Sequence, residues 1–244
     1  MRAYFAQLMT PERREALAAT TGEYGEGNVY REVVAQMGQD GWLTLGWPKE
    51  YGGQERSAMD QLIFTDEAAI AGAPVPFLTI NSVAPTIMHF GTDEQKAFFL
   101  PKISRGELHF AIGYSEPEAG TDLASLRTSA VRDGDDYVIN GQKMWTSLIQ
   151  YADYVWLACR TDPEAKKHKG ISMLIVPHHG RRLLLHTGSH HGRPRHQRHL
   201  LPGRAGPGVV DRGSGTRRLG TDHQSAQPRA RCPHLGRTDS DRAA

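Results

Sequence analysis

Apolar side chains recur at helical spacing through the first 106 residues. Within Asn28–Gln39 they fall on one side of a predicted helix, at Val29, Val33, Val34 and Met37. A second helix is predicted over Met59–Ala71, with Leu62, Ile63 and Ala69 facing inward. The glycines and proline of GWPKEYGGQ, between these two segments, predict a loop.

Thr92 begins a third predicted helix. The run from Thr92 to Gln95 has the capping-box pattern, in which the threonine side chain faces the backbone N–H of Gln95. The helix carries the apolar run Phe98–Leu100 and is expected to meet Pro101 at its end.

From His109 onward the apolar positions form short runs that are typical of strands. Five strands are predicted, at His109–Tyr114, Ser125–Arg132, Asp136–Asn140, Tyr151–Arg160 and Gly170–Val176. Asp133-Gly134-Asp135 is a hairpin signal between the second and third. Helices followed by strands, without βαβ alternation, indicate an α+β fold. We expect an all-α helical domain over residues 1–108 and a truncated antiparallel β domain over residues 109–177.

The composition changes abruptly after Pro177. Residues 178–244 contain no Lys, Glu, Ile, Met, Phe, Trp or Tyr, and their 13 Arg and 4 Asp give a formal charge of +9. Residues 1–177 carry −7, so the overall charge of +2 averages two unlike parts. Because the tail cannot bury enough apolar surface to offset the entropy of ordering its backbone, we expect it to be disordered.

Cysteine content and hydropathy set expectations about the compartment. The two cysteines, Cys159 and Cys232, predict no disulfide framework and favour a reducing environment. The N-terminus lacks the apolar core of a signal peptide. No stretch approaches the roughly 20 apolar residues that a membrane span requires. A cytoplasmic protein without a membrane span is therefore expected.

The segment Ile112–Ser147 carries the richest set of functional groups. Its first strand ends at Ser115 and Glu116, which supply a hydroxyl and a carboxylate. Gly120 and Thr121 follow in a turn, where small side chains would let the backbone approach an anionic ligand closely.

The end of this segment places a large flat ring beside two hydroxyl groups, at Trp145, Thr146 and Ser147. Such a group suits one face of a planar cofactor. Taken singly, however, a tryptophan is most often a core residue and a Ser-Glu-Pro turn is most often only a turn.

The combination of motifs is far more specific. Across residues 1–177 the chain resembles the acyl-CoA dehydrogenase family, through the GWPKEYGG, YSEPEAGTD and NGQKMWTS blocks. The resemblance implies a flavoenzyme in which FAD takes a hydride from the β-carbon of an acyl-CoA while a carboxylate removes the α-proton. The product would be the trans-2-enoyl thioester. The alternative is a truncated, catalytically inactive fragment of such an enzyme.

The resemblance also assigns roles to individual residues. Backbone groups of the first strand and the Ser115 hydroxyl would meet the pyrimidine edge of the flavin. Thr121 would contact the cofactor pyrophosphate or the pantetheine arm of the substrate. Trp145 would lie against the flavin, and the Ser147 hydroxyl would reach toward N5. The expected cofactor-binding set is Ile112, Gly113, Tyr114, Ser115, Thr121, Trp145, Thr146 and Ser147.

Several residues also have plainer interpretations. Ser147 could be only a hydroxyl at a strand end. Glu116 is expected to cap or to pair with a basic group rather than to act as the base. His89 and His109 are expected to be core histidines, and Lys166–Lys169 a solvated run of charge.

The resemblance leaves the acid–base half of the site unfilled. The family's base is a glutamate of a C-terminal helical domain, and no glutamate follows Pro177, so no catalytic residue is assigned. For an intact relative the resemblance implies an electron-transfer flavoprotein as partner and a homo- or hetero-oligomeric assembly. The style of the N-terminal blocks suggests bulky substrates, including steroid-derived acyl-CoA esters.

The tail has an explanation at the level of the gene. Read one nucleotide later, His199–Pro207 permits TYYQDVRVP, and Gly220–Arg231 permits GLITNQLNHERV. Both strings resemble the family's continuation, in its order and spacing. We interpret residues 178–244 as out-of-frame translation that begins near Pro177.

Two rival interpretations of the tail are an Arg-rich nucleic-acid arm and a His-rich metal tract. The histidines lack a regular ligand spacing and no Cys pairs occur, which argues against a metal site. No aromatic residues interleave with the arginines for base stacking. Neither a metal nor a nucleic acid is therefore expected as a ligand.

Overall fold

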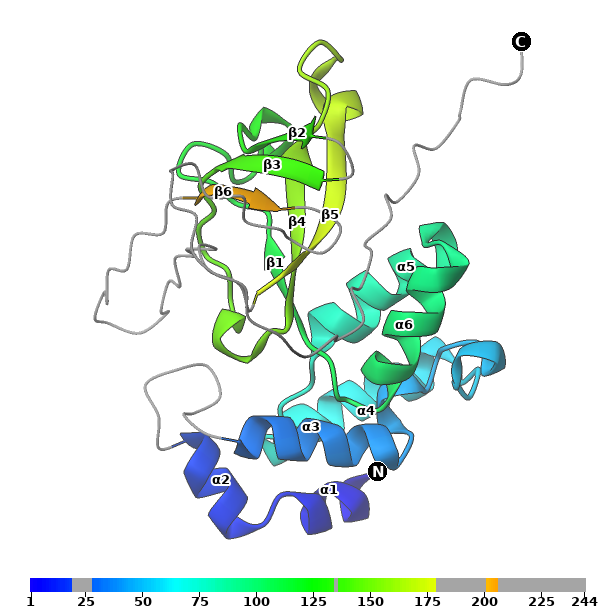
Figure 1. Cartoon of the computed structure of the whole chain (residues 1–244). Helices are drawn as coiled ribbons and strands as arrows, with labels where there is room; N and C mark the ends of the chain where they lie inside the picture. The colour runs from blue at the N-terminus through cyan, green and yellow to red at the C-terminus, as the bar shows by residue number, and fades with distance from the viewer. Residues whose placement is uncertain (19–27, 134–135, 179–200, 206–244) are drawn as a thin grey trace, which may run out of the picture.

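The computed structural model describes residues 1–18, 28–133 and 136–178, together with the backbone of residues 201–205. A group of helices formed by the N-terminal part of the chain lies against a curled β-sheet formed by the following residues (Figure 1). The α+β fold class predicted from the sequence is confirmed. The other tail residues, on which the expectation of disorder also falls, lie outside the described residues.

Six α-helices are described: α1 (Arg2–Leu8), α2 (Pro11–Ala18), α3 (Val29–Gln39), α4 (Ala58–Ala71), α5 (Ala84–Phe90) and α6 (Asp93–Ser104). A π-helical turn, η3 (Thr79–Val83), leads directly into α5. Short 3-10 turns occur at η1 (Trp42–Thr44), η2 (Lys49–Tyr51), η4 (Leu123–Ser125), η5 (Ile149–Tyr151) and η6 (Lys167–Gly170). None of the described helices is long and apolar enough to cross a membrane.

The predicted face of α3 and the start of α6 are confirmed. Val33, Val34 and Met37 are fully buried in the helical core. The capping box forms as expected, since the Thr92 hydroxyl accepts from the Gln95 backbone N–H and the Gln95 side chain accepts from the Thr92 N–H.

Other details of the helical region differ from the prediction. In α4, Leu62 and Ile63 are 54% and 44% exposed and Ala69 is also exposed, whereas Phe64 and Ala68 face the core. The apolar residues of α4 itself lie on several sides of the helix, so their spacing does not identify a single inward face.

Two boundaries in the helical region also differ. Helix α6 continues past Pro101 to Ser104, because buried Phe99, Leu100 and Ile103 hold its last turns against the core. The loop GWPKEYGGQ contains the turn η2.

The sheet contains six strands: β1 (Phe110–Gly113), β2 (Ser129–Asp133), β3 (Asp136–Gly141), β4 (Tyr154–Arg160), β5 (Ile171–Pro177) and β6 (Leu201–Ala205). Their order is β1-β4-β2-β3-β6, and β5 pairs with β4 along its whole length. The predicted hairpin forms between β2 and β3, with Asp133 opposite Asp136.

The sheet is mixed rather than purely antiparallel. β1 and β4 pair in parallel from Phe110↔Tyr154 to Gly113↔Leu157, and β2 meets β4 in parallel at Ser129↔Arg160. The reason is topological: the hairpin and the segment after it form a long connection between β1 and β4, which allows the two to run in the same direction.

Strand β6 corrects the expectation that the whole tail is disordered. Leu201–Ala205 pairs antiparallel with β3, from Tyr137↔Ala205 to Gly141↔Leu201. Ladder hydrogen bonds are made by the backbone, so an open strand edge accepts a segment largely irrespective of its composition.

The helices and the sheet share one apolar core. Phe99 of α6 packs edge-on against Tyr154 of β4, with the ring centroids 5.2 Å apart. Polar contacts add to this junction: Arg31 of α3 donates to Asp153, and the Asp153 carboxylate accepts from the His109 N–H just before β1. Apolar contacts and polar contacts therefore both hold the start of β1 against the helical region.

Gly38 of α3 marks a close approach between α3 and the backbone that follows α6. A Cβ at this position would lie 2.2 Å from the carbonyl carbon of Arg105 and 2.6 Å from the backbone N of Gly106. Because both neighbours are backbone atoms, neither can rotate away.

We predict that Gly38→Ala destabilises the protein although alanine is the better helix former. The helix propensity gain of about 1 kcal/mol is outweighed by overpacking, so the free energy of unfolding should fall by roughly 1–3 kcal/mol. Chemical denaturation measures the change. Gly120→Ala is the control, because a Cβ there meets no atom within 4 Å. A Gly38→Ala variant as stable as the control would contradict the close approach.

Candidate flavin site

Two segments that are far apart in the sequence meet at the end of β1. The backbone N–H of Met144 donates to the Ser115 carbonyl at 2.8 Å. This bond brings the YSEPEAGTD block beside the NGQKMWTS block, so the structure unites the two motifs in which the predicted flavin contacts lie.

A buried ion pair lies beneath this junction. Lys143 Nζ is 2.8 Å from Glu116 Oε1, and the two side chains are 0% and 6% exposed. Lys143 also donates to the Tyr114 carbonyl at 2.9 Å. Glu116 in turn accepts from the backbone N–H groups of Arg127 and Thr128, at 2.6 and 2.9 Å. The expectation that Glu116 pairs with a basic group is confirmed.

The environment sets the charge state of both partners. Burial raises the pKa of Glu116, but hydrogen bonds from Lys143, Thr128 and the Arg127 backbone outweigh burial and hold the pKa below its usual value. Burial lowers the pKa of Lys143, while Glu116 acts in the opposite direction. We infer that the pair is charged, because each ion has an oppositely charged partner at hydrogen-bond distance.

Lys143 was not among the residues predicted from the sequence. A signal was present, since this lysine stands two residues before Trp145 inside the NGQKMWTS block. What the sequence does not show is that a lysine, normally a surface residue, is fully buried here.

The first group of predicted flavin residues lies along β1 and just after it. Ile112 is half-buried and Gly113 is buried within the strand, while Tyr114 and Ser115 follow it and are half-buried. A side chain at Gly113 would meet Leu157 and Val155 of β4, so this glycine serves the packing of the sheet.

The second group adopts an unusual backbone. Trp145 and Leu148 have φ values of 57° and 60°, in the left-handed region that residues with a Cβ rarely enter. The Trp145 side chain is 58% exposed. Thr146 is fully buried and its hydroxyl has no hydrogen-bond partner within the described residues, while Ser147 is half-buried. A large exposed ring therefore directly precedes two hydroxyl-bearing residues in the chain.

Thr121 stands apart from these groups. It is exposed on the loop between β1 and η4, and no hydrogen bond among the described residues joins it to Ser115 or to Trp145. Its neighbour Asp122 pairs with Lys167 at 3.0 Å.

Residues 1–107 match the acyl-CoA dehydrogenase N-terminal domain, and residues 111–198 match the acyl-CoA dehydrogenase middle domain. The chain belongs to the acyl-CoA dehydrogenase family. Enzymes of this family are flavin-dependent oxidoreductases.

Relatives in the family are similar over much of this chain. Acyl-CoA dehydrogenase FadE26 of Mycobacterium tuberculosis is 82% identical over 180 residues, which are 72% of this chain and 45% of that protein. A chain in the crystal structure of the ChsE4-ChsE5 complex from Mycobacterium tuberculosis is 80% identical, with a TM-score of 0.67, over 72% of this chain and 44% of that one. A chain of the Tcur3481-Tcur3483 steroid ACAD is 48% identical, with a TM-score of 0.68, over 84% and 54%. The chain thus spans about half the length of these relatives.

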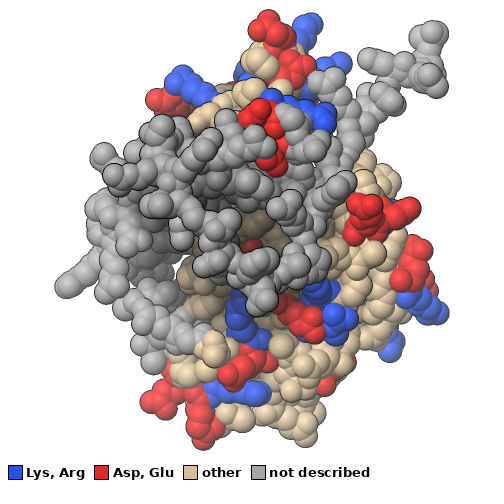
Figure 2. Space-filling model, viewed as in Figure 1, with Lys and Arg blue, Asp and Glu red and all other residues tan. Residues whose placement is uncertain are grey.

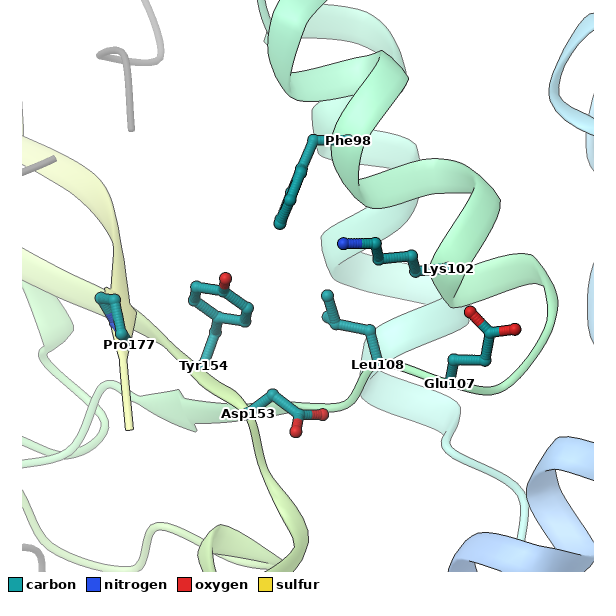
Figure 3. Close-up of a pocket in the computed structure, with 7 residues that line it drawn as sticks. All are labelled: Phe98, Lys102, Glu107, Leu108, Asp153, Tyr154 and Pro177. Atoms are coloured by element: carbon teal, nitrogen blue, oxygen red, sulfur yellow. The ribbon is translucent and has the colours of Figure 1, made fainter. Parts of the chain in front are cut away.

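A pocket of about 360 Å³ lies at the other end of β1 (Figure 3). It is lined by Phe98, Lys102, Glu107, Leu108, Asp153, Tyr154 and Pro177. Its charged groups already have partners: Lys102 Nζ lies 3.6 Å from the centroid of the Phe98 ring in the same pocket, Glu107 pairs with Arg105, and Asp153 pairs with Arg31. Because Leu108 precedes β1 and Ser115 follows it, the pocket and the predicted flavin contacts lie at opposite ends of the strand.

Of the remaining candidates, His89 is exposed in the last turn of α5, so the prediction that it is a core histidine is wrong. Lys166–Lys169 are exposed, as expected of a solvated run. On the face drawn in Figure 2, acidic and basic side chains are interspersed over the described residues rather than gathered in one basic area.

His109 is a core residue, as expected, but an unsatisfied one. It is 3% exposed, neither ring nitrogen makes a well-formed hydrogen bond to any of the residues that the structure describes, and the ring lies 5.4 Å from that of Tyr30. Burial and the neighbouring Arg31 charge lower the pKa of His109 to about 4, although Asp153 acts in the opposite direction.

We predict that His109 makes the protein acid-sensitive. Between pH 6.5 and pH 4 the unfolded chain takes up a proton that the folded chain refuses, so stability falls as the pH falls, by at most about 1.4 kcal/mol per unit. Denaturation of wild type and His109→Phe at pH 8, 6 and 4.5 measures the effect. The free energy of unfolding of His109→Phe, taken relative to that of wild type, should be higher at pH 4.5 than at pH 8. A constant difference would contradict a neutral, buried His109.

Proposed function

We propose that this chain provides the flavin-contacting surface of an enzyme that dehydrogenates an acyl-CoA thioester between its α- and β-carbons. The observation that carries the proposal is the junction of the two signature blocks through Met144 and Ser115. Bound FAD would supply the chemistry of hydride acceptance at the β-carbon. The protein groups bind the cofactor, orient it and tune it.

The residues present fit a flavin. Trp145 offers an exposed aromatic face, which suits stacking against a planar ring system. Ser115 and Ser147 are both half-buried, so a ligand at the surface could reach their hydroxyls. The buried hydroxyl of Thr146, which has no hydrogen-bond partner in the part of the chain that the structure describes, adds a polar group next to Trp145 in the sequence. Ile112, Gly113 and Tyr114 would supply backbone along the flavin, and exposed Thr121 would meet the pyrophosphate or the pantetheine arm.

The carboxylate of the signature block does not act as the base in this proposal. Glu116 is buried, ion-paired with Lys143, and accepts hydrogen bonds from two backbone N–H groups. A carboxylate held in its ionised form by such partners is a poor proton acceptor. Removal of the α-proton therefore requires a carboxylate other than Glu116.

Relatives suggest the substrate class and the partners. One similar structure is described as a steroid ACAD and another as a ChsE4-ChsE5 complex. Their names support a bulky, steroid-derived acyl-CoA as substrate and a second subunit as partner of this chain. An electron-transfer flavoprotein would receive the electrons, as the family resemblance implies.

The proposal extends to the tail, which we infer to be out-of-frame translation of the same gene. Support comes from the change in composition after Pro177, beyond which the tail is rich in Arg and His and lacks Glu. Sequencing the gene across codons 170–185 is expected to reveal an inserted or missing base. A gene that encodes no family-like continuation in the shifted frame would contradict this inference.

We predict that the purified chain binds FAD and that Trp145→Ala weakens binding. Loss of the stacked ring should raise the Kd by roughly tenfold, since an aromatic pair contributes about 0.5–1.5 kcal/mol beyond the area that it buries. Quenching of flavin fluorescence on titration gives the Kd. Phe90→Ala is the matched control, because it removes an exposed aromatic ring of α5.

A second arm of this experiment tests the substrate. A steroid-derived acyl-CoA should perturb the absorption spectrum of the bound flavin at lower concentration than a straight-chain acyl-CoA. Equal effects of the two would overturn the bulky substrate class and leave the flavin site intact. A chain that binds no FAD, or binds it equally well with Ala at position 145, would overturn the proposed site.

A further inference from the structure

The buried ion pair joins three segments whose relative positions determine the geometry of the proposed flavin site. Glu116 follows β1, Arg127 and Thr128 precede β2, and Lys143 follows β3. Every bond in the cluster crosses from one of these segments to another. The cluster therefore works as a staple, which we call the Lys143–Glu116 staple.

We propose that Lys143 is a positioning residue for the flavin, and that its staple with Glu116 sets the spacing between Ser115 and the Trp145–Ser147 segment. The proposal rests on the function proposed above. It assigns to Lys143 no contact with the cofactor or the substrate.

The position of Lys143 within the sheet supports this role. Its Cγ lies 3.6 Å from the point that a Cβ on Gly113 would occupy, so the aliphatic stem runs against β1. Its ammonium group then reaches the Tyr114 carbonyl and Glu116. The Lys143 side chain thus extends along the end of β1 and contacts the residues on either side of Ser115.

Stability alone does not explain a charged pair at this depth. Well-packed apolar residues often stabilise a buried site as well as an ion pair does, whereas removal of one partner is strongly destabilising. The ion pair differs from apolar packing because its hydrogen bonds are directional: the ammonium group donates to two fixed oxygens, those of the Tyr114 carbonyl and of Glu116. These bonds fix the position of Lys143 relative to the end of β1, as a positioning role requires.

The strained backbone beyond Lys143 supplies the link to the flavin contacts. Left-handed φ values at Trp145 and Leu148 persist only where surrounding contacts determine them. On one side those contacts are the staple and the Met144–Ser115 bond, and on the other the turn η5 with buried Ile149. Without the staple, Trp145 is free to relax to a negative φ, which redirects its ring.

The test uses the full chain and the double variant Glu116→Gln/Lys143→Met. This variant removes both charges together, so no unpaired charge stays buried, and its amide oxygen still accepts from one of the two backbone N–H groups. It is expected to fold, with a melting temperature below that of wild type, because the other N–H group and the Tyr114 carbonyl each lose a hydrogen bond. Hydrogen exchange without FAD should be at least roughly tenfold faster in residues 112–117 and 142–148, and unchanged in α3 and β4. By analogy with residues behind metal ligands, FAD binding should weaken by roughly tenfold.

Lys49→Met is the matched control, because it removes a lysine from the exposed pair with Glu55. It should change neither the exchange of the two segments nor the affinity for FAD. If the double variant does not fold, Glu116→Asp, which keeps both charges but shortens the carboxylate arm by one methylene, gives the same readouts with a smaller expected change.

The outcomes separate the two proposals. A folded double variant with wild-type exchange in both segments, or with wild-type FAD affinity, overturns the positioning role. A wild-type chain that fails to bind FAD overturns the proposed function. Hydrogen exchange then decides by itself whether Lys143 anchors the two segments.

Discussion

The local architecture depends on the buried ion pair between Lys143 and Glu116. A lysine with no exposed surface is tolerated only if its charge is met, and here the carboxylate and the Tyr114 carbonyl meet it. Removal of one partner from such a pair typically costs about 3–5 kcal/mol, because the other charge is left buried. Separation of the three segments would expose this cost, so the folded chain holds their ends together.

The mixed sheet is what makes this meeting possible. β1 pairs in parallel with β4, and the chain that leaves the β2–β3 hairpin returns to the end of β1, where the Met144 N–H donates to the Ser115 carbonyl. The opposite end of β1 is tied to the helices through the contacts that Asp153 makes with Arg31 and His109. One short strand thus connects the helical core to the predicted flavin contacts, with a different anchor at each end.

Features governed by local chemistry could be predicted from the sequence, and features governed by tertiary contacts could not. The Thr92 capping box and the face of α3 follow from side chains within one helical turn of each other. The inward face of α4 does not, because apolar residues surround that helix and only packing selects Phe64 over Leu62. The strand β6 was missed for a similar reason, since backbone pairing with β3 requires no apolar pattern.

The site shows the same division. Its predicted residues came from motifs, and the pairing of Glu116 could be anticipated because a carboxylate near a buried strand needs a partner. Nothing in the sequence identified Lys143 as that partner or predicted the left-handed backbone of Trp145, since both depend on contacts between distant segments.

The commitment of Glu116 to Lys143 has a chemical consequence. A carboxylate that is already engaged by an ammonium group and by backbone N–H groups keeps its negative charge and loses its basicity. In the proposed function, the signature block would orient a flavin without competing for the substrate's α-proton. Orientation of the hydride acceptor and removal of the proton would then fall to different carboxylates. A charge-neutral anchor behind the predicted flavin contacts would leave the carboxylate that acts as base free to be tuned for proton transfer alone.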